Sequence, residues 1–262
     1  MRKRIRSLAA MLPGCSSWRD AGGKVRLADR IVIVTGAGRG IGRGIALKSA
    51  REGADLVIAS RLASELETLA DEILAMGRQV VVQPTDVSQE DQVQRLIERT
   101  LAEFGRVDVL VNNAGTIVMP GEILETTVEA WDTMMAVNAR SVFLCCKAVL
   151  PGMIERRAGK IINISSVAGL RGLPNRAGYC ASKYAVNGFS ASLAIDMKPY
   201  GIAVNVICPG AVDTPLTGIS RPDDDKTDWI KPADIADACV YLASDESRMV
   251  TGAILEVAGW AG

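Results

Sequence analysis

The sequence contains no histidine, and this absence excludes several kinds of catalytic and metal site. Histidine is the usual proton carrier near neutral pH, the base of hydrolytic triads and a common zinc ligand. The six cysteines include no CxxC pair, so a zinc site built from paired thiols is not expected either. We predict that the chain holds no metal and that any proton transfer depends on another side chain.

Net charge and long apolar runs are also missing. The 30 basic and 30 acidic residues cancel and are interspersed, so we expect no partner that is a nucleic acid or an anionic membrane. No segment supplies about 18 uninterrupted apolar residues, so no membrane-spanning helix is expected. Most cysteines lie in apolar segments, as free buried thiols do, which favours a reducing compartment and a cytoplasmic location.

The first 26 residues differ from the rest of the chain. They are basic at the start and rich in helix breakers later, so we expect a flexible extension over residues 1–26 and one domain over residues 27–262. Two alternatives are an export signal ending at Cys15 and an organelle presequence. The apolar run before Pro13 is shorter than the usual core of an export signal, which favours the extension.

Beyond Arg30, short β-branched runs alternate with helical patterns. The runs are Ile31–Thr35, Asp55–Ser60, Gln79–Thr85, Val107–Val111, Lys160–Ser165, Ile202–Cys208 and Ala253–Val257. Parallel strands need connections long enough for a helix, so this alternation predicts an α/β fold. We expect a single Rossmann-type doubly wound domain, whose seven-stranded parallel sheet is flanked by helices on both faces and binds ligands beyond the carboxyl ends of its strands.

Two irregular segments follow predicted strands. The first strand runs into TGAGRGIG (residues 35–42), where glycines let the backbone approach a pyrophosphate at the start of the next helix. The spacing is not GxGxxG, so the standard dinucleotide fingerprint does not match. The segment from Thr214 to Lys231 contains two prolines, one glycine and an acidic run. It is interpreted as a solvated loop or, alternatively, as a short lid over a substrate.

Four motifs occur in order at the expected strand ends. They are TGxxxGxG in the first turn, NNAG at residues 112–115, a serine after the fifth strand, and YxxxK at residues 179–183. Together they resemble the short-chain dehydrogenase/reductase family over Leu27 to Ala258, most of all members of the 3-oxoacyl-carrier-protein reductase type. The resemblance implies that a nicotinamide dinucleotide binds Gly36, Gly38, Arg39, Gly40, Ile41, Gly42, Ser60, Arg61, Asp86, Val87, Asn113, Ala114, Gly115, Tyr179, Lys183, Pro209, Gly210, Val212 and Thr214.

The expected cofactor is NADP(H) rather than NAD(H). An acidic residue at the end of the second strand would bind the adenosine ribose and repel a 2′-phosphate, but Ser60 and Arg61 stand there. Arg39 in the glycine turn would add a second guanidinium, which suits a phosphate. Asp86 resembles the family residue that contacts adenine. In an alternative interpretation this stretch is local, because Ser88 and Asp91 could form a capping box for the next helix.

A tyrosine and a lysine would replace the missing histidine. Tyr179 and Lys183 are four residues apart, so they share one face of a helix. A free tyrosine has a pKa of about 10, and a neighbouring ammonium is expected to lower it. By family spacing Ser166, rather than Ser165, orients the substrate oxygen. Asn138 matches the family asparagine that supports a water relay, although a bond within a helix contact is an alternative role.

The sequence therefore predicts an NADP(H)-dependent oxidoreductase that interconverts a carbonyl and a secondary alcohol, with Tyr179 as general acid and base. A 3-oxoacyl thioester is the first candidate among small-molecule substrates. The alternatives are a sugar or polyol dehydrogenase and a non-catalytic dinucleotide-binding sensor. The resemblance also implies that the turn after the sixth predicted strand, residues 209–214, places Thr214 against the nicotinamide carboxamide. A purely structural turn after Pro209 is also consistent with the sequence. The resemblance further implies a homotetramer or homodimer.

Overall fold

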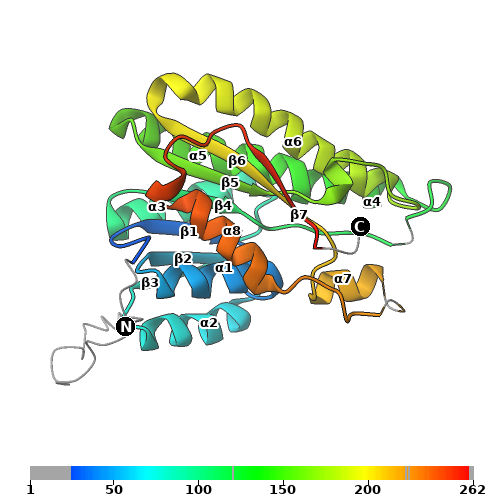
Figure 1. The fold of residues 1–262 in the computed structure, drawn as a ribbon, viewed down its shortest axis with the longest axis horizontal. Helices are drawn as coiled ribbons and strands as arrows, with labels where there is room; N and C mark the ends of the chain where they lie inside the picture. The colour runs from blue at the N-terminus through cyan, green and yellow to red at the C-terminus, as the bar shows by residue number, and fades with distance from the viewer. Residues whose placement is uncertain (1–24, 120, 222, 224, 260–262) are drawn as a thin grey trace.

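The computed structural model of the chain describes residues 25–259, apart from residues 120, 222 and 224. In this part of the chain, seven strands form one parallel sheet in the order β3-β2-β1-β4-β5-β6-β7 (Figure 1). The strands are β1 (Ile31–Thr35), β2 (Asp55–Ser60), β3 (Val80–Pro84), β4 (Val109–Asn112), β5 (Gly159–Ile164), β6 (Ile202–Pro209) and β7 (Ile254–Val257). The predicted fold class is confirmed. The bounds of β1 and β2 are as predicted, and those of the other strands differ by one or two residues. The proposed extension lies outside the described residues up to residue 24.

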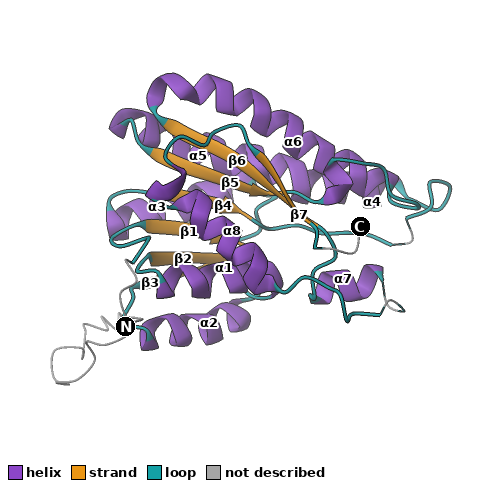
Figure 2. Cartoon of the chain, viewed as in Figure 1, coloured by secondary structure: helices purple, strands orange, loops and turns teal. Residues whose placement is uncertain are grey.

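Helices cover both faces of the sheet (Figure 2). Side chains alternate along each strand, so Val32 and Val34 pack into one core cluster and Ile33 into the other. The first cluster is closed by α1 (Gly40–Arg51), α2 (Ala63–Ala75) and α8 (Pro232–Ala243). The second is closed by α3 (Glu90–Phe104), α5 (Ser141–Arg156) and α6 (Ala177–Met197). Burial on both faces explains why the strands are almost continuously apolar.

The longest helical stretch, Val128–Arg156, is apolar enough to cross a membrane by length and composition. It consists of α4 (Val128–Met134), a π-helical turn η1 (Met135–Arg140) and α5. Val142, Cys145 and Met153 of α5 are buried in the second core cluster against the sheet. Packing within this domain therefore accounts for part of the apolar composition, since 44% of the apolar window is buried.

The order of the strands reverses beside β1, which pairs with β2 on one side and β4 on the other. In open parallel sheets, the loops that follow the two strands at such a reversal run in opposite directions and leave a crevice. Ligands bind in this crevice, outside the carboxyl ends of the strands. The segment after β6 also returns to this edge. It forms a short helix α7 (Pro215–Ser220). Val212 and Ile230 form an isolated parallel β-bridge, which holds the two ends of this segment together.

Candidate active site

A cavity of about 490 Å³ opens at the carboxyl ends of the strands. Most of the residues predicted from the sequence line it: Gly36, Gly38, Arg39, Gly40, Ile41, Ser60, Arg61, Asp86, Val87, Asn113, Ala114, Gly115, Ser166, Tyr179, Lys183, Pro209, Gly210, Val212 and Thr214. Gly42 and Asn138 do not line it. Residues from helix α6 and from the ends of six strands, β1 to β6, thus converge on one space. Each assigned role within it stays a prediction.

In the turn between β1 and α1, the glycine positions leave little room for a side chain. Gly36 and Gly40 have positive φ angles of 63° and 57°, and a Cβ atom on Gly36 would lie 2.8 Å from the Cα atom of Ala114. The turn ends at Arg39, whose side chain makes no capping hydrogen bond to α1. Backbone N–H groups at the start of α1 thus remain available to an anionic ligand, and these residues fit the pyrophosphate of a dinucleotide.

Gly42, in the first turn of α1, packs closely against the backbone of the glycine turn. A Cβ atom there would lie 2.2 Å from the Gly36 carbonyl oxygen, so Gly42→Ala must displace the turn. We expect the free energy of unfolding to fall by about 1–3 kcal/mol, as in other overpacked sites, and the affinity for NADPH to fall with it. Urea unfolding and calorimetric titration measure the two effects.

The matched control for this prediction is Gly188→Ala in α6. Gly188 is exposed, and a Cβ atom there would have no neighbour within 4 Å. This change should stabilise the chain by roughly 0.5–1 kcal/mol because alanine favours a helix over glycine. An unchanged dinucleotide affinity in the Gly42 variant would contradict the assigned position of the turn.

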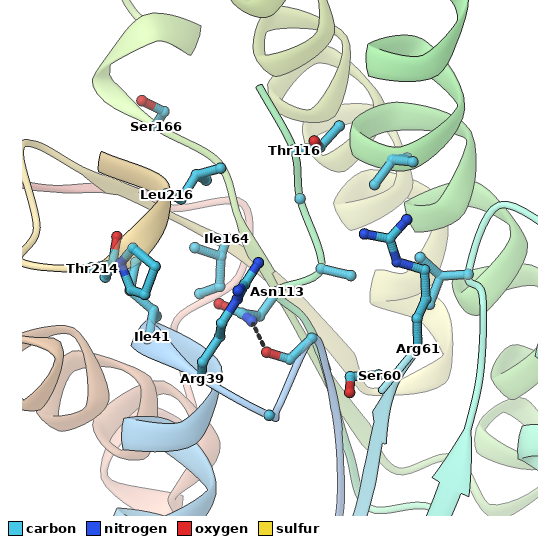
Figure 3. A pocket seen from close by; sticks show the side chains of 18 of the residues that line it. Arg39, Ile41, Ser60, Arg61, Asn113, Thr116, Ile164, Ser166, Thr214 and Leu216 are labelled. Carbon is cyan, nitrogen blue, oxygen red and sulfur yellow. Dashed lines mark hydrogen bonds between the residues drawn. The ribbon is translucent and has the colours of Figure 1, made fainter. Parts of the chain in front are cut away.

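The NNAG segment after β4 is tied to the glycine turn. The Thr35 hydroxyl oxygen accepts hydrogen bonds from the backbone N–H groups of Asn113 at 3.0 Å and Ala114 at 3.1 Å. The Asn113 side-chain amide donates to the Thr35 carbonyl oxygen at 2.9 Å and to the Gly36 carbonyl oxygen at 3.1 Å, the second of which is drawn in Figure 3. These bonds hold the ends of β1 and β4 together, so both motifs face the same cavity.

At the other end of the cavity, Figure 3 shows Arg39 and Arg61 on opposite sides of Ser60. The carboxylate of Asp86 accepts hydrogen bonds from the backbone N–H of Ser88 at 3.0 Å and from its hydroxyl at 2.7 Å. The alternative capping box is wrong, because α3 begins only at Glu90 and its preceding residue makes no side-chain cap. The Ser88 hydroxyl is already used by Asp86, and this local turn fixes the Asp86 side chain at the cavity.

The predicted catalytic pair, Tyr179 and Lys183, lies on the first two turns of α6. The Lys183 Nζ atom is 5.8 Å from the centroid of the Tyr179 ring and donates a hydrogen bond to the Ile164 carbonyl oxygen at 3.1 Å. Burial lowers the pKa of Lys183 to about 8. Burial raises the pKa of Tyr179, although a hydrogen bond with the Ser166 hydroxyl acts in the opposite direction. The prediction that Lys183 gives Tyr179 a lowered pKa is therefore wrong for the chain without a bound dinucleotide.

Both serines after β5 line the cavity, but they have different partners. Ser165 donates a hydrogen bond through its hydroxyl to the Lys183 backbone carbonyl oxygen at 3.2 Å, which ties β5 to α6. The Ser166 hydroxyl oxygen accepts a hydrogen bond from the Ala168 backbone N–H at 3.1 Å, and its hydrogen bond with the Tyr179 phenol acts to lower the pKa of that phenol. This arrangement favours Ser166 over Ser165 as the partner of the tyrosine.

Asn138 is buried in the π-helical turn and holds two other segments together. Its carboxamide oxygen accepts from the Thr116 backbone N–H at 2.7 Å. Its amide donates to the Thr116 carbonyl oxygen and the Ser182 hydroxyl, each at 2.9 Å. This geometry matches the alternative role of Asn138 as a bonded residue in an internal contact. Its predicted part in a water relay stays a prediction.

The segment after β6 crosses the cavity above the glycine turn. A Cβ atom on Gly40 would lie 3.2 Å from the Thr214 side chain, so these two segments are in near contact. Thr214 caps α7 by accepting a hydrogen bond from the Thr217 N–H at 3.3 Å. Leu216 and Thr217 line the cavity. The structure thus brings part of the irregular segment to the site, as the alternative interpretation of a short lid requires.

Several cavity residues were missed by the sequence analysis. They include Glu65 on α2, Thr116 after β4 and Leu216 on α7. None belongs to a motif with a recognisable spacing, and only Leu216 lies in a segment for which the sequence suggested a role, the possible lid. Their positions depend on how α2, α4 and α7 pack around the strand ends.

The arrangement of the thiols and acidic groups of the described residues bears on whether the chain could hold a metal ion. In the part of the chain that the structure describes, no group of three or more histidine, cysteine, aspartate or glutamate side chains is arranged to hold a metal ion. The expectation that no metal is bound stays a prediction. Cys145, Cys146, Cys180, Cys208 and Cys239 are free and buried, as the apolar surroundings in the sequence indicated.

Comparisons with known proteins agree with this arrangement. Residues 30–225 match the family described as short chain dehydrogenase. The chain is 39% identical over 248 residues to the 3-oxoacyl-acyl-carrier-protein reductase FabG of Chlamydia trachomatis, a match that covers 89% of this chain and 97% of the relative. The crystal structure of levodione reductase matches with a TM-score of 0.85 and 32% identity, covering 88% of this chain and 97% of that one.

A second solved structure, of actinorhodin polyketide ketoreductase with NADPH, matches with a TM-score of 0.84 and 32% identity over 88% of this chain and 96% of that one. The chain belongs to the short chain dehydrogenase family. It is an oxidoreductase of this family and resembles its 3-oxoacyl-acyl-carrier-protein reductases. Members of the family bind a nicotinamide dinucleotide, and Gly36, Gly38 and Gly40 of the glycine turn line the cavity.

Proposed function

We propose that the chain is an NADP(H)-dependent oxidoreductase that interconverts a carbonyl and a secondary alcohol. The observation that carries this proposal is the convergence of two parts on one cavity. The uncapped start of α1 and its glycine turn lie at one end, and Tyr179, Ser166 and Lys183 lie at the other. The first part suits a pyrophosphate, and the second suits proton transfer to an oxygen atom.

Each catalytic side chain has a distinct task in this proposal. The Tyr179 phenol donates its proton to the carbonyl oxygen in reduction and accepts the alcohol proton in oxidation. The Ser166 hydroxyl orients the same oxygen, and the Lys183 ammonium stabilises the phenolate that forms on Tyr179. The nicotinamide, when bound, supplies or accepts the hydride. Because burial raises the pKa of Tyr179, the phenol is protonated at neutral pH and ready for reduction.

The preference for NADP(H) is supported by charge at the adenosine end. Arg39 and Arg61 line the cavity beside Ser60, and guanidinium groups bind phosphate through paired hydrogen bonds. The related polyketide ketoreductase was solved with NADPH. NAD(H) is the second choice in this proposal.

The substrate class is a small carbonyl or alcohol, with a 3-oxoacyl thioester as first candidate because of the FabG relative. The cavity is lined by both apolar and hydroxyl side chains, including Val137, Leu216 and Thr116. This mixed lining also admits a sugar or polyol. The proposal further includes a cytoplasmic location and a homodimer or homotetramer.

Initial rates test the proposal directly. NADPH or NADH is mixed with ketones, 3-oxoacyl thioesters, quinones and sugars, and absorbance at 340 nm is followed. We expect carbonyl-dependent oxidation of NADPH, faster than that of NADH. Efficient turnover of NADH alone would reject the NADP(H) assignment, while dinucleotide binding without turnover of any carbonyl would favour the non-catalytic sensor.

A further inference from the structure

The adenosine end of the cavity contains a carboxylate that the sequence did not reveal there. Glu65, in the first turn of α2, lines the cavity together with Ser60 and Arg39. Its carboxylate lies over Gly38, since a Cβ atom on that glycine would be 2.4 Å from the Glu65 Oε2 atom and 3.2 Å from the Ser60 hydroxyl. Glu65 therefore occupies the space above the glycine turn, next to the end of β2.

Glu65 also interacts with one of the two expected phosphate ligands. Its Oε1 atom is 3.9 Å from the Arg39 Nη1 atom, a distance that marks an ion pair. The Glu65 side chain is only 29% exposed, whereas the Arg39 side chain is 61% exposed. The carboxylate is thus the more firmly placed partner, and Arg39 is the one that can turn toward a ligand.

The other acidic group at this end is differently engaged. Asp86 accepts two hydrogen bonds from Ser88 within its own turn, whereas Glu65 has Arg39 as its ion-pair partner. Among the described residues that line the cavity, the adenosine end therefore has two carboxylates beside the guanidiniums of Arg39 and Arg61. The sequence argument for NADP(H) assumed guanidiniums without a carboxylate.

We infer that Glu65 determines how strongly the site prefers a 2′-phosphate to a ribose hydroxyl. The inference rests on the proposed function as a dinucleotide-dependent enzyme. A carboxylate repels the 2′-phosphate, competes with it for Arg39, and can accept hydrogen bonds from the ribose hydroxyls of NAD(H). Glu65 thereby weakens the preference set by Arg39 and Arg61, and it acts from α2 rather than from the strand end where such a carboxylate was expected.

Adenosine 2′,5′-bisphosphate and adenosine 5′-monophosphate provide the sharpest test, because they differ only in the 2′-phosphate and need no turnover. Calorimetric titration gives both dissociation constants for the intact chain and for Glu65→Gln. We expect the ratio that favours the bisphosphate to increase about fivefold, the size of one partly exposed charge interaction. The ratio of kcat/KM for NADPH over NADH should increase in the same direction.

Glu67→Gln is the matched control, because Glu67 is exposed on the same helix and does not line the cavity. It removes the same charge without altering the site. In a chain that already carries Arg39→Gln, Glu65→Gln should increase the ratio that favours the bisphosphate by less than it does in the intact chain. The reason is that part of the effect of Glu65 depends on its competition with the phosphate for Arg39. Equal ratios in the Glu65 and Glu67 variants would overturn the inference.

Failure of the proposed function gives a different result. If the intact chain binds both nucleotides but reduces no carbonyl, the catalytic proposal fails while the nucleotide ratios still decide the role of Glu65. If neither nucleotide binds the intact chain, the dinucleotide site and the inference about Glu65 are both overturned.

Discussion

Tyr179→Phe is expected to lower kcat for carbonyl reduction by about a hundred- to ten-thousandfold, the range of general acid catalysis. Phenylalanine keeps the aromatic ring but has no proton to give to the carbonyl oxygen. The affinity for NADPH should stay unchanged, because the glycine turn and the start of α1, rather than the phenol hydroxyl, are the proposed binding site of the pyrophosphate. Initial rates at 340 nm and calorimetric titration measure both quantities.

Ser166→Ala provides a graded comparison for this result. It removes the hydroxyl that lies near the Tyr179 phenol but leaves the proton donor in place. We expect a smaller loss of kcat than in the tyrosine variant. A Tyr179→Phe enzyme that retains its kcat would show that another group protonates the substrate.

Lys183→Met is the second change with a large expected effect. It removes the ammonium that stabilises the Tyr179 phenolate, so kcat should fall by at least about a hundredfold. The intact enzyme should lose reductive activity as the pH rises through about 8, where Lys183 loses its charge. The pH profile of kcat in the variant should lack this decline. Rates from pH 6 to pH 10 make the comparison.

Stability should behave differently from activity in this variant. The pKa of Lys183 falls from 10.5 to about 8 on folding, a difference of about 3 kcal/mol. Below about pH 8 the folded chain pays this full desolvation penalty, and between about pH 8 and 10.5 the penalty disappears as the folded lysine becomes neutral. The methionine variant should therefore not unfold more easily at pH 7. A large loss of stability there, measured by thermal unfolding, would make the loss of kcat a folding defect.

The fold and the main motifs could be predicted because their signals are local. A strand repeats its side-chain pattern every two residues, and a parallel sheet buried on both faces makes that pattern almost wholly apolar. Tyr179 and Lys183 share a helix face through their spacing of four alone. The glycines of the first turn are needed by the backbone itself, as the positive φ angles of Gly36 and Gly40 show.

Predictions that depended on helix boundaries or on surroundings were less successful. The sequence pattern of a capping box at Ser88 was present, but Asp86 uses the same hydroxyl two residues earlier. Asn138 was identified, yet its amide partners, Thr116 and Ser182, come from two other segments. A sequence records which polar groups are present, but competition among their partners is decided only when the chain is folded.

The sequence by itself determined the doubly wound sheet, the glycine turn and the tyrosine–lysine pair, since each follows from backbone conformation or from the period of a helix or strand. Tertiary structure decided the charge and acidity of the site. Glu65 reaches Gly38 and Arg39 only because α2 packs beside the first turn. Burial between β5, β6 and α6 raises the pKa of Tyr179 and lowers that of Lys183. Electrostatic interactions and desolvation depend on distances and on the exclusion of water, and neither is set by spacing along the chain.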